Sequence, residues 1–196
     1  KTIKGQKIEW VNDLDELNSL PCIFIANEFF DALPIKQFIK IKNKWHERHV
    51  KFKNEKKSEF FDIPFNMQNF EKKIKFKISL KQKFIEYSPL ASEFLKKITN
   101  KIKLNNGGIL IIDYGYMDKK MKNTLQAVSK HKYTDVLGTF GSSDITYNLN
   151  FNLFSKMIRK LGSFFQATTT QKEFLTNIGI LKRAEILSKN MPFSKK

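Results

Sequence analysis

The sequence predicts an α/β fold in which short apolar strands pair in parallel and are separated by helices. Cys22-Ile-Phe-Ile-Ala26 is an apolar run that follows Pro21 and ends in polar residues, as is typical of a buried strand. Ile109-Leu-Ile-Ile112 is a second such run, after the turn Asn105-Asn-Gly-Gly108. A helix, a glycine turn, an apolar strand and a terminal acid, Asp113, together describe half of a βαβ unit. The 196 residues are enough for one domain with a real core.

The first part of the chain predicts strands and an insertion. Ile8-Glu-Trp-Val11 has the pattern of a short strand. Trp45 to Phe52 and Glu59 to Ile63 are rich in aromatic and β-branched residues, which predicts the two arms of a hairpin. Residues 40–85 are rich in lysine, and we expect them to form an inserted lid. Within this lid, the alternation of apolar residues from Ile74 to Leu80 favours one further strand.

A long helix is predicted after the lid. Ser88 is a good N-cap and Pro89 a good first helical residue. The helix ends near Lys103, and its apolar side chains recur at helical spacing. These are Leu90, Phe94, Leu95, Ile98 and Ile102.

The last third alternates weak and strong patterns. Residues 117–150 show little periodicity, so we expect a long loop with short helical turns. Phe154, Ile158 and Leu161 predict a helix that Gly162 ends, and 163–168 a strand. Two closing helices are expected, at 172–178 and 181–188.

The amino-acid composition argues against several classes of protein. The net charge of +17 suggests a polyanion partner, but the cations are nearly all lysine, with arginine only at positions 48, 159 and 183. A protein that recognises nucleic acid typically uses arginine for bidentate contacts, so this composition disfavours nucleic acid as a partner. No apolar run approaches the ~20 residues needed to span a bilayer. A single cysteine excludes a disulfide within the chain, and three histidines without a Cys/His cluster disfavour a metal site.

Two acidic motifs follow the predicted buried strands. In Asn27-Glu-Phe-Phe-Asp31, the two carboxylates are three residues apart and would share one side of a helical turn. They would then either begin a helix or orient or desolvate a cationic nucleophile at the carboxyl edge of the sheet. Asp113-Tyr114 follows the second strand, where the acid would either cap the next turn or line a pocket. His131 is either an acid/base group or an exposed histidine without a role.

Six segments in a fixed order carry a family resemblance. They are Ile25–Pro34, Trp45–Arg48, Glu86–Pro89, Gly108–Tyr116, Thr124–Val128 and Thr170–Leu175. With these motifs the chain resembles the MidA-like family of S-adenosylmethionine-dependent methyltransferases, from about Ile8 to Leu187. That family includes a mitochondrial factor that methylates an arginine on a core subunit of respiratory complex I.

The resemblance implies a class I, Rossmann-like fold with a seven-stranded sheet. Residues 1–39 and 86–190 would be the C-terminal part of its methyltransferase domain, 40–85 the lid and 191–196 a tail. The strands at 8–11, 22–26 and 109–112 would be the third, fourth and fifth. The glycine-rich cofactor loop and the ribose-binding acid would lie outside this chain, so we expect the chain alone to be inactive.

The resemblance also implies roles for residues. Glu28 and Asp31 would be catalytic, acting on an arginine of a protein substrate. Asn12, Asp13 and Asn27 would contact the cofactor, S-adenosylmethionine. The substrate groove would contain Asp113, Tyr114, Gln126, His131 and Asp144.

Two other readings stay open at this point. The fold could serve as a scaffold for binding proteins during assembly, since fold does not fix function. Aromatic side chains of the lid would then hold an apolar partner: Trp45, Phe52, Phe60, Phe61 and Phe65. Nucleic-acid binding ranks third and would show a steep dependence of affinity on salt. The compartment would be the cytoplasm in a bacterium or the mitochondrial matrix in a eukaryote.

Overall fold

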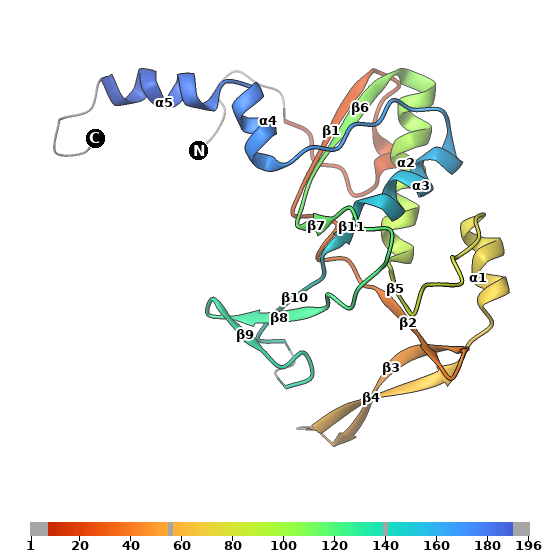
Figure 1. Ribbon diagram of the computed structural model, residues 1–196. Coiled ribbons are helices and arrows are strands. Elements are labelled where there is room, and N and C mark those ends of the chain that lie inside the picture. The colour runs from red at the N-terminus through yellow and green to blue at the C-terminus, as the bar shows by residue number, and fades with distance from the viewer. Residues whose placement is uncertain (1–7, 55–56, 139–140, 190–196) are drawn as a thin grey trace. The chain divides into compact units, whose positions relative to one another are not determined.

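The computed structural model describes residues 8–54, 57–138 and 141–189 (Figure 1). The chain divides into two compact units, Lys1–Phe164 and Phe165–Lys196. The first holds the sheets and the candidate site, and the second holds two helices. The tail expected at 191–196 lies outside the described residues.

The predicted parallel pair of strands is confirmed. Strand β1 (Cys22–Asn27) pairs in parallel with β6 (Gly107–Ile112), from Cys22 opposite Gly107 to Asn27 opposite Ile112 (Figure 1). Gly107 has a φ of +124°, and a Cβ there would lie 2.0 Å from the carbonyl oxygen of Cys22. Only glycine therefore allows this close start of the pairing.

Only one face of β1 is covered among the described residues. Helix α2 (Pro89–Asn105) packs against β1 and β6 and buries Ala91 and Leu95. On the other face of β1, Ile23 is 74% and Ile25 is 70% exposed. The expectation of a fully buried strand at 22–26 is therefore wrong for the described chain. The edge of β1 opposite β6 also has no strand among the described residues.

Helix α2 begins where the sequence predicts. The Ser88 hydroxyl accepts a hydrogen bond from the Ala91 amide at 3.1 Å and donates one to the Pro34 carbonyl at 2.8 Å. The Ser88 side chain thus connects the start of α2 to Pro34, which lies between the turn after β1 and the next strand.

A four-stranded antiparallel sheet occupies most of the segment expected to be a lid. Its order is β4 (Lys57–Pro64), β3 (Lys44–Asn54), β2 (Lys36–Ile41) and β5 (Phe84–Tyr87). The predicted hairpin is confirmed, with His49 opposite Phe61.

The strand expected from Ile74 to Leu80 is wrong. Helix α1 (Met67–Ile74), capped by Asn66, takes up its first residue, and turns follow. The helix buries Phe70 against Phe38 of β2, with ring centroids 4.9 Å apart. The packing of Phe70 stabilises 67–74 as a helix, and this outweighs the alternating pattern of apolar residues that begins at Ile74.

The segment 117–150 contains strands where helical turns were expected. A small antiparallel sheet has the order β10 (Asp144–Thr146), β8 (Gln126–Ser129) and β9 (Lys132–Thr134). Two further short strands, β7 (Gly115–Tyr116) and β11 (Leu149–Asn150), pair in parallel. These strands have two to four residues, too few to produce a visible period of two.

Two expected strands are absent from the described chain. Residues 8–11 and 163–168 are irregular, and a short 3-10 helix, η1 (Leu14–Glu16), follows the first. Trp10 is 93% and Phe165 is 95% exposed. A strand forms only with a hydrogen-bonding neighbour, and neither segment has one among the described residues.

The predicted C-terminal helices are confirmed. Helix α3 (Phe151–Leu161) ends before Gly162 and buries Leu153, Phe154 and Met157. In the second unit, α4 (Gln171–Asn177) and α5 (Ile180–Lys189) follow each other. Among the described residues, no helix is long and apolar enough to cross a membrane.

Candidate active site

The carboxyl ends of β1 and β6 bring two acidic segments together. The Glu28 amide donates to the carbonyl of Ile112 at 2.9 Å, which extends the parallel pairing by one residue. Glu28 and Asp113 therefore leave the same edge of the sheet, where ligands of open α/β sheets bind. Glu28 is exposed and has a φ of +46°. This left-handed conformation costs a non-glycine residue about 1–2 kcal/mol, and such strain clusters at functional sites.

Asp113 organises the turn after β1. One of its carboxylate oxygens, Oδ2, accepts the amides of Phe30 and Asp31 at 3.1 and 3.2 Å. The other, Oδ1, accepts the Tyr114 amide at 2.9 Å. The sequence left open whether Asp113 caps the next turn or lines a pocket. The structure shows that it caps the next turn, at Tyr114, and also the turn after β1.

Asp31 is the most enclosed acid of this cluster. It is 5% exposed, and its Oδ1 atom makes no hydrogen bond in the described part of the chain. Burial raises the pKa of Asp31, and the charge of Glu28 raises it further. Burial, then the charge of Asp31, raises the pKa of Asp113 from 3.8 to about 6. A buried carboxylate oxygen without a partner is costly, so it marks a place where a cation or a donor would bind.

Aromatic rings form the apolar side of this turn. Phe30 is fully buried and makes edge-to-face contacts with Phe29 at 5.1 Å and Phe154 at 5.4 Å. These contacts anchor the turn on the core.

Tyr147 adds a phenol that the sequence did not point to. Its amide donates to the Asp31 carbonyl at 3.1 Å, and its hydroxyl is buried without a hydrogen-bond partner in the described part of the chain. Burial, then the charge of Asp113, raises the pKa of this phenol. It therefore stays protonated at neutral pH and available as a donor. Tyr147 lies in the aperiodic segment 117–150, so no pattern singled it out.

A second buried carboxylate, Glu86, fixes the loop that follows β7. It accepts hydrogen bonds from the Gln37 side chain at 2.9 Å and from the amides of Thr124 and Leu125 at 3.0 and 3.2 Å. It also accepts the Thr124 hydroxyl at 2.5 Å. The carboxylate of Glu86 therefore joins the motifs at 86–89 and 124–128. The sequence motif contains Glu86 but does not indicate this contact.

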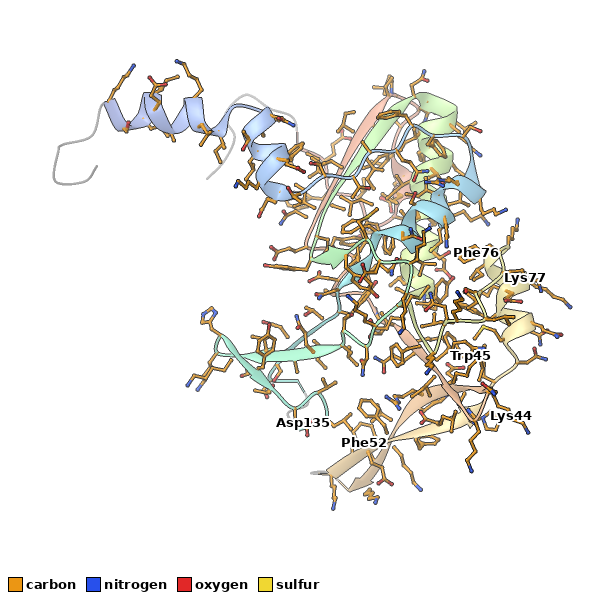
Figure 2. All side chains as sticks on the ribbon, viewed as in Figure 1. Lys44, Trp45, Phe52, Phe76, Lys77 and Asp135 are labelled. Carbon is orange, nitrogen blue, oxygen red and sulfur yellow. The ribbon has the colours of Figure 1, made fainter. Side chains whose placement is uncertain are left out.

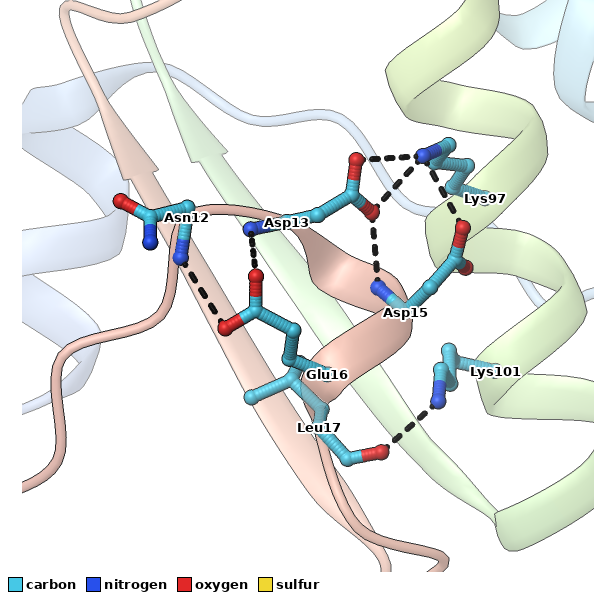
Figure 3. Close-up of polar contacts among 7 residues, drawn as sticks. All are labelled: Asn12, Asp13, Asp15, Glu16, Leu17, Lys97 and Lys101. Carbon is cyan, nitrogen blue, oxygen red and sulfur yellow. Dashed lines mark hydrogen bonds and ion pairs between the residues drawn. The ribbon is translucent and has the colours of Figure 1, made fainter.

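The residues expected at the cofactor lie in two places. Asn27 is exposed at the end of β1, beside Glu28. Asp13 caps η1 and binds the Lys97 ammonium at 2.7 and 2.8 Å (Figure 3). This ammonium lowers the pKa of Asp13. The Asn12 amide donates to Glu16 at 3.3 Å. Asn12 and Asp13 are thus held against α2, and their cofactor role remains a prediction.

The residues expected in the substrate groove separate into two groups. Asp113 and Tyr114 lie in the acidic cluster, where the Tyr114 side chain is exposed. Gln126 and Asp144 lie in the small sheet, where the Gln126 amide donates to the Thr146 hydroxyl at 3.2 Å. His131 is exposed in the β8–β9 turn with a φ of +61°. Within the described ranges, no hydrogen bond joins this second group to the acidic cluster.

The comparisons with known proteins identify the family. Residues 1–168 match the family described as "Putative S-adenosyl-L-methionine-dependent methyltransferase". The chain belongs to this family of S-adenosylmethionine-dependent methyltransferases.

Curated relatives carry one recurring description. The mitochondrial protein arginine methyltransferase NDUFAF7 of Xenopus laevis is 29% identical over 187 residues, which cover 95% of this chain and 42% of that protein. The human protein of the same name is 28% identical over 190 residues, with the same coverage. The chain thus spans a little under half the length of these relatives.

Solved structures show the same fold. A COG1565 superfamily member from Burkholderia thailandensis, crystallised with S-adenosyl-homocysteine, superposes with a TM-score of 0.73 at 21% identity. The match covers 95% of this chain and 48% of that one. A native structure of a COG1565 protein from the same organism gives 0.71 at 22% identity, over 91% of this chain and 48% of that one. The chain therefore has the mixed α/β fold of these proteins.

The acidic cluster fits one part of the family's cofactor. S-adenosylmethionine carries a sulfonium cation, and Glu28, Asp31 and Asp113 place three carboxylates in a chain of net charge +17. The buried, unpaired Oδ1 atom of Asp31 is the observation that favours a cationic neighbour. The sequence has no G-x-G motif to hold the methionine and ribose parts. Among the described residues, no group of three His, Cys, Asp or Glu could hold a metal ion.

Proposed function

We propose that this chain forms the acceptor side of the active site in a methyltransferase that modifies an arginine of a protein. The observation that carries the proposal is the acidic cluster of Glu28, Asp31 and Asp113 at the carboxyl ends of β1 and β6. The family match and the description of the relatives as protein arginine methyltransferases support it.

The carboxylates suit the chemistry of a guanidinium acceptor. A guanidinium is planar and cationic, and paired carboxylates hold its fork with charge-assisted hydrogen bonds. Glu28, which is exposed at the strand end, would hold the fork and accept the proton that leaves the nitrogen as it is methylated. Asp31 would use its unpaired Oδ1 atom on the same group. Asp113 would act as a positioning residue, because its oxygens hold the Phe30, Asp31 and Tyr114 amides.

S-adenosylmethionine, when bound, supplies the methyl group. In this proposal Asn27 faces it from the end of β1, and Asn12 and Asp13 contact its adenine. The exposed face and free edge of β1 favour a class I, seven-stranded sheet completed by residues outside this chain. Those residues would supply the glycine-rich loop and the ribose-binding acid.

The finer assignments follow from the family resemblance and are part of this proposal. The substrate would be a protein, with a core subunit of respiratory complex I as the first choice, and the groove would include Tyr114, Gln126, His131 and Asp144. The compartment would be the mitochondrial matrix in a eukaryote or the cytoplasm in a bacterium.

Glu28→Gln in the intact protein tests the proposal. The amide keeps the size of the side chain but cannot accept the proton, so kcat for arginine methylation should fall at least hundredfold with an unchanged Tm. Mass spectrometry of the acceptor protein would measure methylation. Glu93→Gln, the same substitution on the exposed side of α2, should leave kcat unchanged. Turnover retained by the Glu28 variant would remove this residue from the mechanism.

A second candidate function, a protein-binding assembly module, is favoured by the hairpin of β3 and β4. Of the lid aromatics, Trp45 and Phe65 pack against the core, whereas Phe52, Phe60 and Phe61 are exposed. Figure 2 labels Trp45 and Phe52 of this set. An exposed apolar surface of this kind marks an interaction site. The two functions separate in cells that carry only the Glu28→Gln protein. Normal complex I assembly without methylation would favour the scaffold, and failed assembly would favour catalysis.

A further inference from the structure

A cavity outside the acidic cluster is lined by lysines. Its volume is about 340 Å³, and its walls come from the turn after α1, the segment 119–121 and the first turns of α3. Figure 2 labels Phe76 and Lys77, which begin this wall after α1. The volume lies at the lower end of the range for small-molecule sites, roughly 300–1,000 Å³.

Hydrogen bonds hold the walls of the cavity together. The buried Gln82 side chain donates to the Lys119 carbonyl at 2.6 Å and accepts the Met121 amide at 3.0 Å. The Asn150 side chain donates to the Asp118 carbonyl at 3.0 Å, which joins the same segment to the start of α3. These buried side-chain amides therefore hold the segments that line the cavity in place.

The charge in this cavity is of one sign. Five of its thirteen lining residues are lysines, and none is an aspartate or glutamate. The whole chain has 36 Lys and Arg against 19 Asp and Glu in 196 residues, so the cavity is more basic than the composition supplies. Lys77 pairs with Glu71 at 2.9 Å. The other four lysines have no ion pair within the described residues: Lys81, Lys119, Lys120 and Lys156.

The remaining lining residues limit the ligand further. Ile78, Met121 and Leu153 are buried and form an apolar floor. Ammonium groups act as point charges and bind phosphate without the bidentate geometry of arginine. Four lysines without an ion pair among the lining residues of one small cavity match a ligand with several negative charges close together.

We propose that this cavity binds a small molecule with a chain of phosphate groups, at a site separate from the acidic cluster. The proposal does not rest on methyl transfer, because the lysines and the carboxylates belong to different parts of the fold. Its ligand is either the phosphate chain alone or a nucleoside triphosphate whose base uses the apolar floor.

Calorimetric titration of the full chain with inorganic tripolyphosphate tests the proposal. We expect one saturable site and a loss of affinity of at least tenfold in Lys119→Gln/Lys120→Gln, since two of four unpaired ammonium groups are removed. The matched control is Lys130→Gln/Lys132→Gln, which removes two exposed lysines near the β8–β9 turn. It lowers the net charge equally and should change affinity less than threefold. Lys156→Gln, on α3, should weaken binding as a second, independent variant.

Further titrants separate the possible ligands. ATP binding ten times more tightly than tripolyphosphate would assign the base to the apolar floor, and equal affinities would assign the phosphate chain alone. Equal losses in both double variants, or binding without saturation, would overturn the proposal and indicate general attraction to a chain of charge +17. Binding of an oligouridine with a steep salt dependence and no response to either double variant would likewise contradict it.

Discussion

Asp113 links the geometry of the candidate site to its ionisation. Its carboxylate accepts three amide hydrogen bonds, which favour the charged form, yet burial and the charge of Asp31 raise its pKa to about 6. Desolvation therefore outweighs the hydrogen bonds. Two acids with raised pKa values side by side are suited to share a cation, since a positive charge would relieve both.

Asp113→Asn should reveal this cost in the pH dependence of stability. The folded pKa of about 6 lies above the ordinary 3.8, so the native state binds more protons between these values. The wild type should therefore lose on the order of 1–2 kcal/mol of unfolding free energy relative to the variant as the pH rises from 4 to 7. Urea unfolding at a series of pH values measures the difference.

The control for this experiment is Asp13→Asn. The Lys97 ammonium lowers the pKa of Asp13, so its titration falls below pH 4 and the variant should run parallel to the wild type between pH 4 and 7. Parallel curves for Asp113→Asn as well would show that Asp113 does not titrate as we expect.

At the scale of elements, buried carboxylates and caps connect segments that are distant in the sequence. Glu86 of β5 holds both Gln37 of β2 and the amides of the loop at 124–125. Ser88 caps α2 and binds the Pro34 carbonyl. These contacts place the four-stranded sheet beside the segments that lead to the candidate site. The motifs at 86–89 and 124–128 therefore have a structural role, because their residues connect separate elements of the fold.

Glu86→Gln should destabilise the fold. The amide oxygen of the variant can keep the bonds made by one carboxylate oxygen, but its NH2 group would face the Thr124 hydroxyl that donates to the other, and the loss of this buried pairing costs about 1–3 kcal/mol. Chemical denaturation would show a lower midpoint with an unchanged m-value. Glu93→Gln, on an exposed face, should stay within about 0.5 kcal/mol of the wild type. A Glu86 variant as stable as this control would show that the carboxylate does not hold the loop.

At the scale of the whole molecule, the sheet of β1 and β6 carries only the acidic cluster of the proposed active site. β1 has one free edge and an exposed apolar face among the described residues. The chain spans 42% of the length of its NDUFAF7 relatives and 48% of the bacterial structures. The proposed methyl transfer therefore needs partner residues on the far side of Glu28 and Asp31.

The chain alone should bind S-adenosylmethionine weakly, with no heat of saturable binding below the millimolar range in calorimetry. The physical reason is that this sequence has no G-x-G motif to hold the methionine and ribose parts of the cofactor. The intact protein, measured in parallel, should bind in the micromolar range. Tight binding by this chain would show that its own residues complete the cofactor site.

The sequence by itself determined the parallel strand pair, the long helix with its Ser88 cap, the hairpin and the position of Glu28 and Asp31 at a strand end. These features depend on local patterns: apolar runs, caps and turns. Only the tertiary structure decided that Asp31 is buried, that Tyr147 binds the Asp31 carbonyl, that Glu86 joins β5 to β2 and the loop at 124–125, and that 8–11 and 163–168 are not strands. Burial and strand pairing depend on neighbours distant in the chain, and no local pattern of residues encodes which neighbours are present.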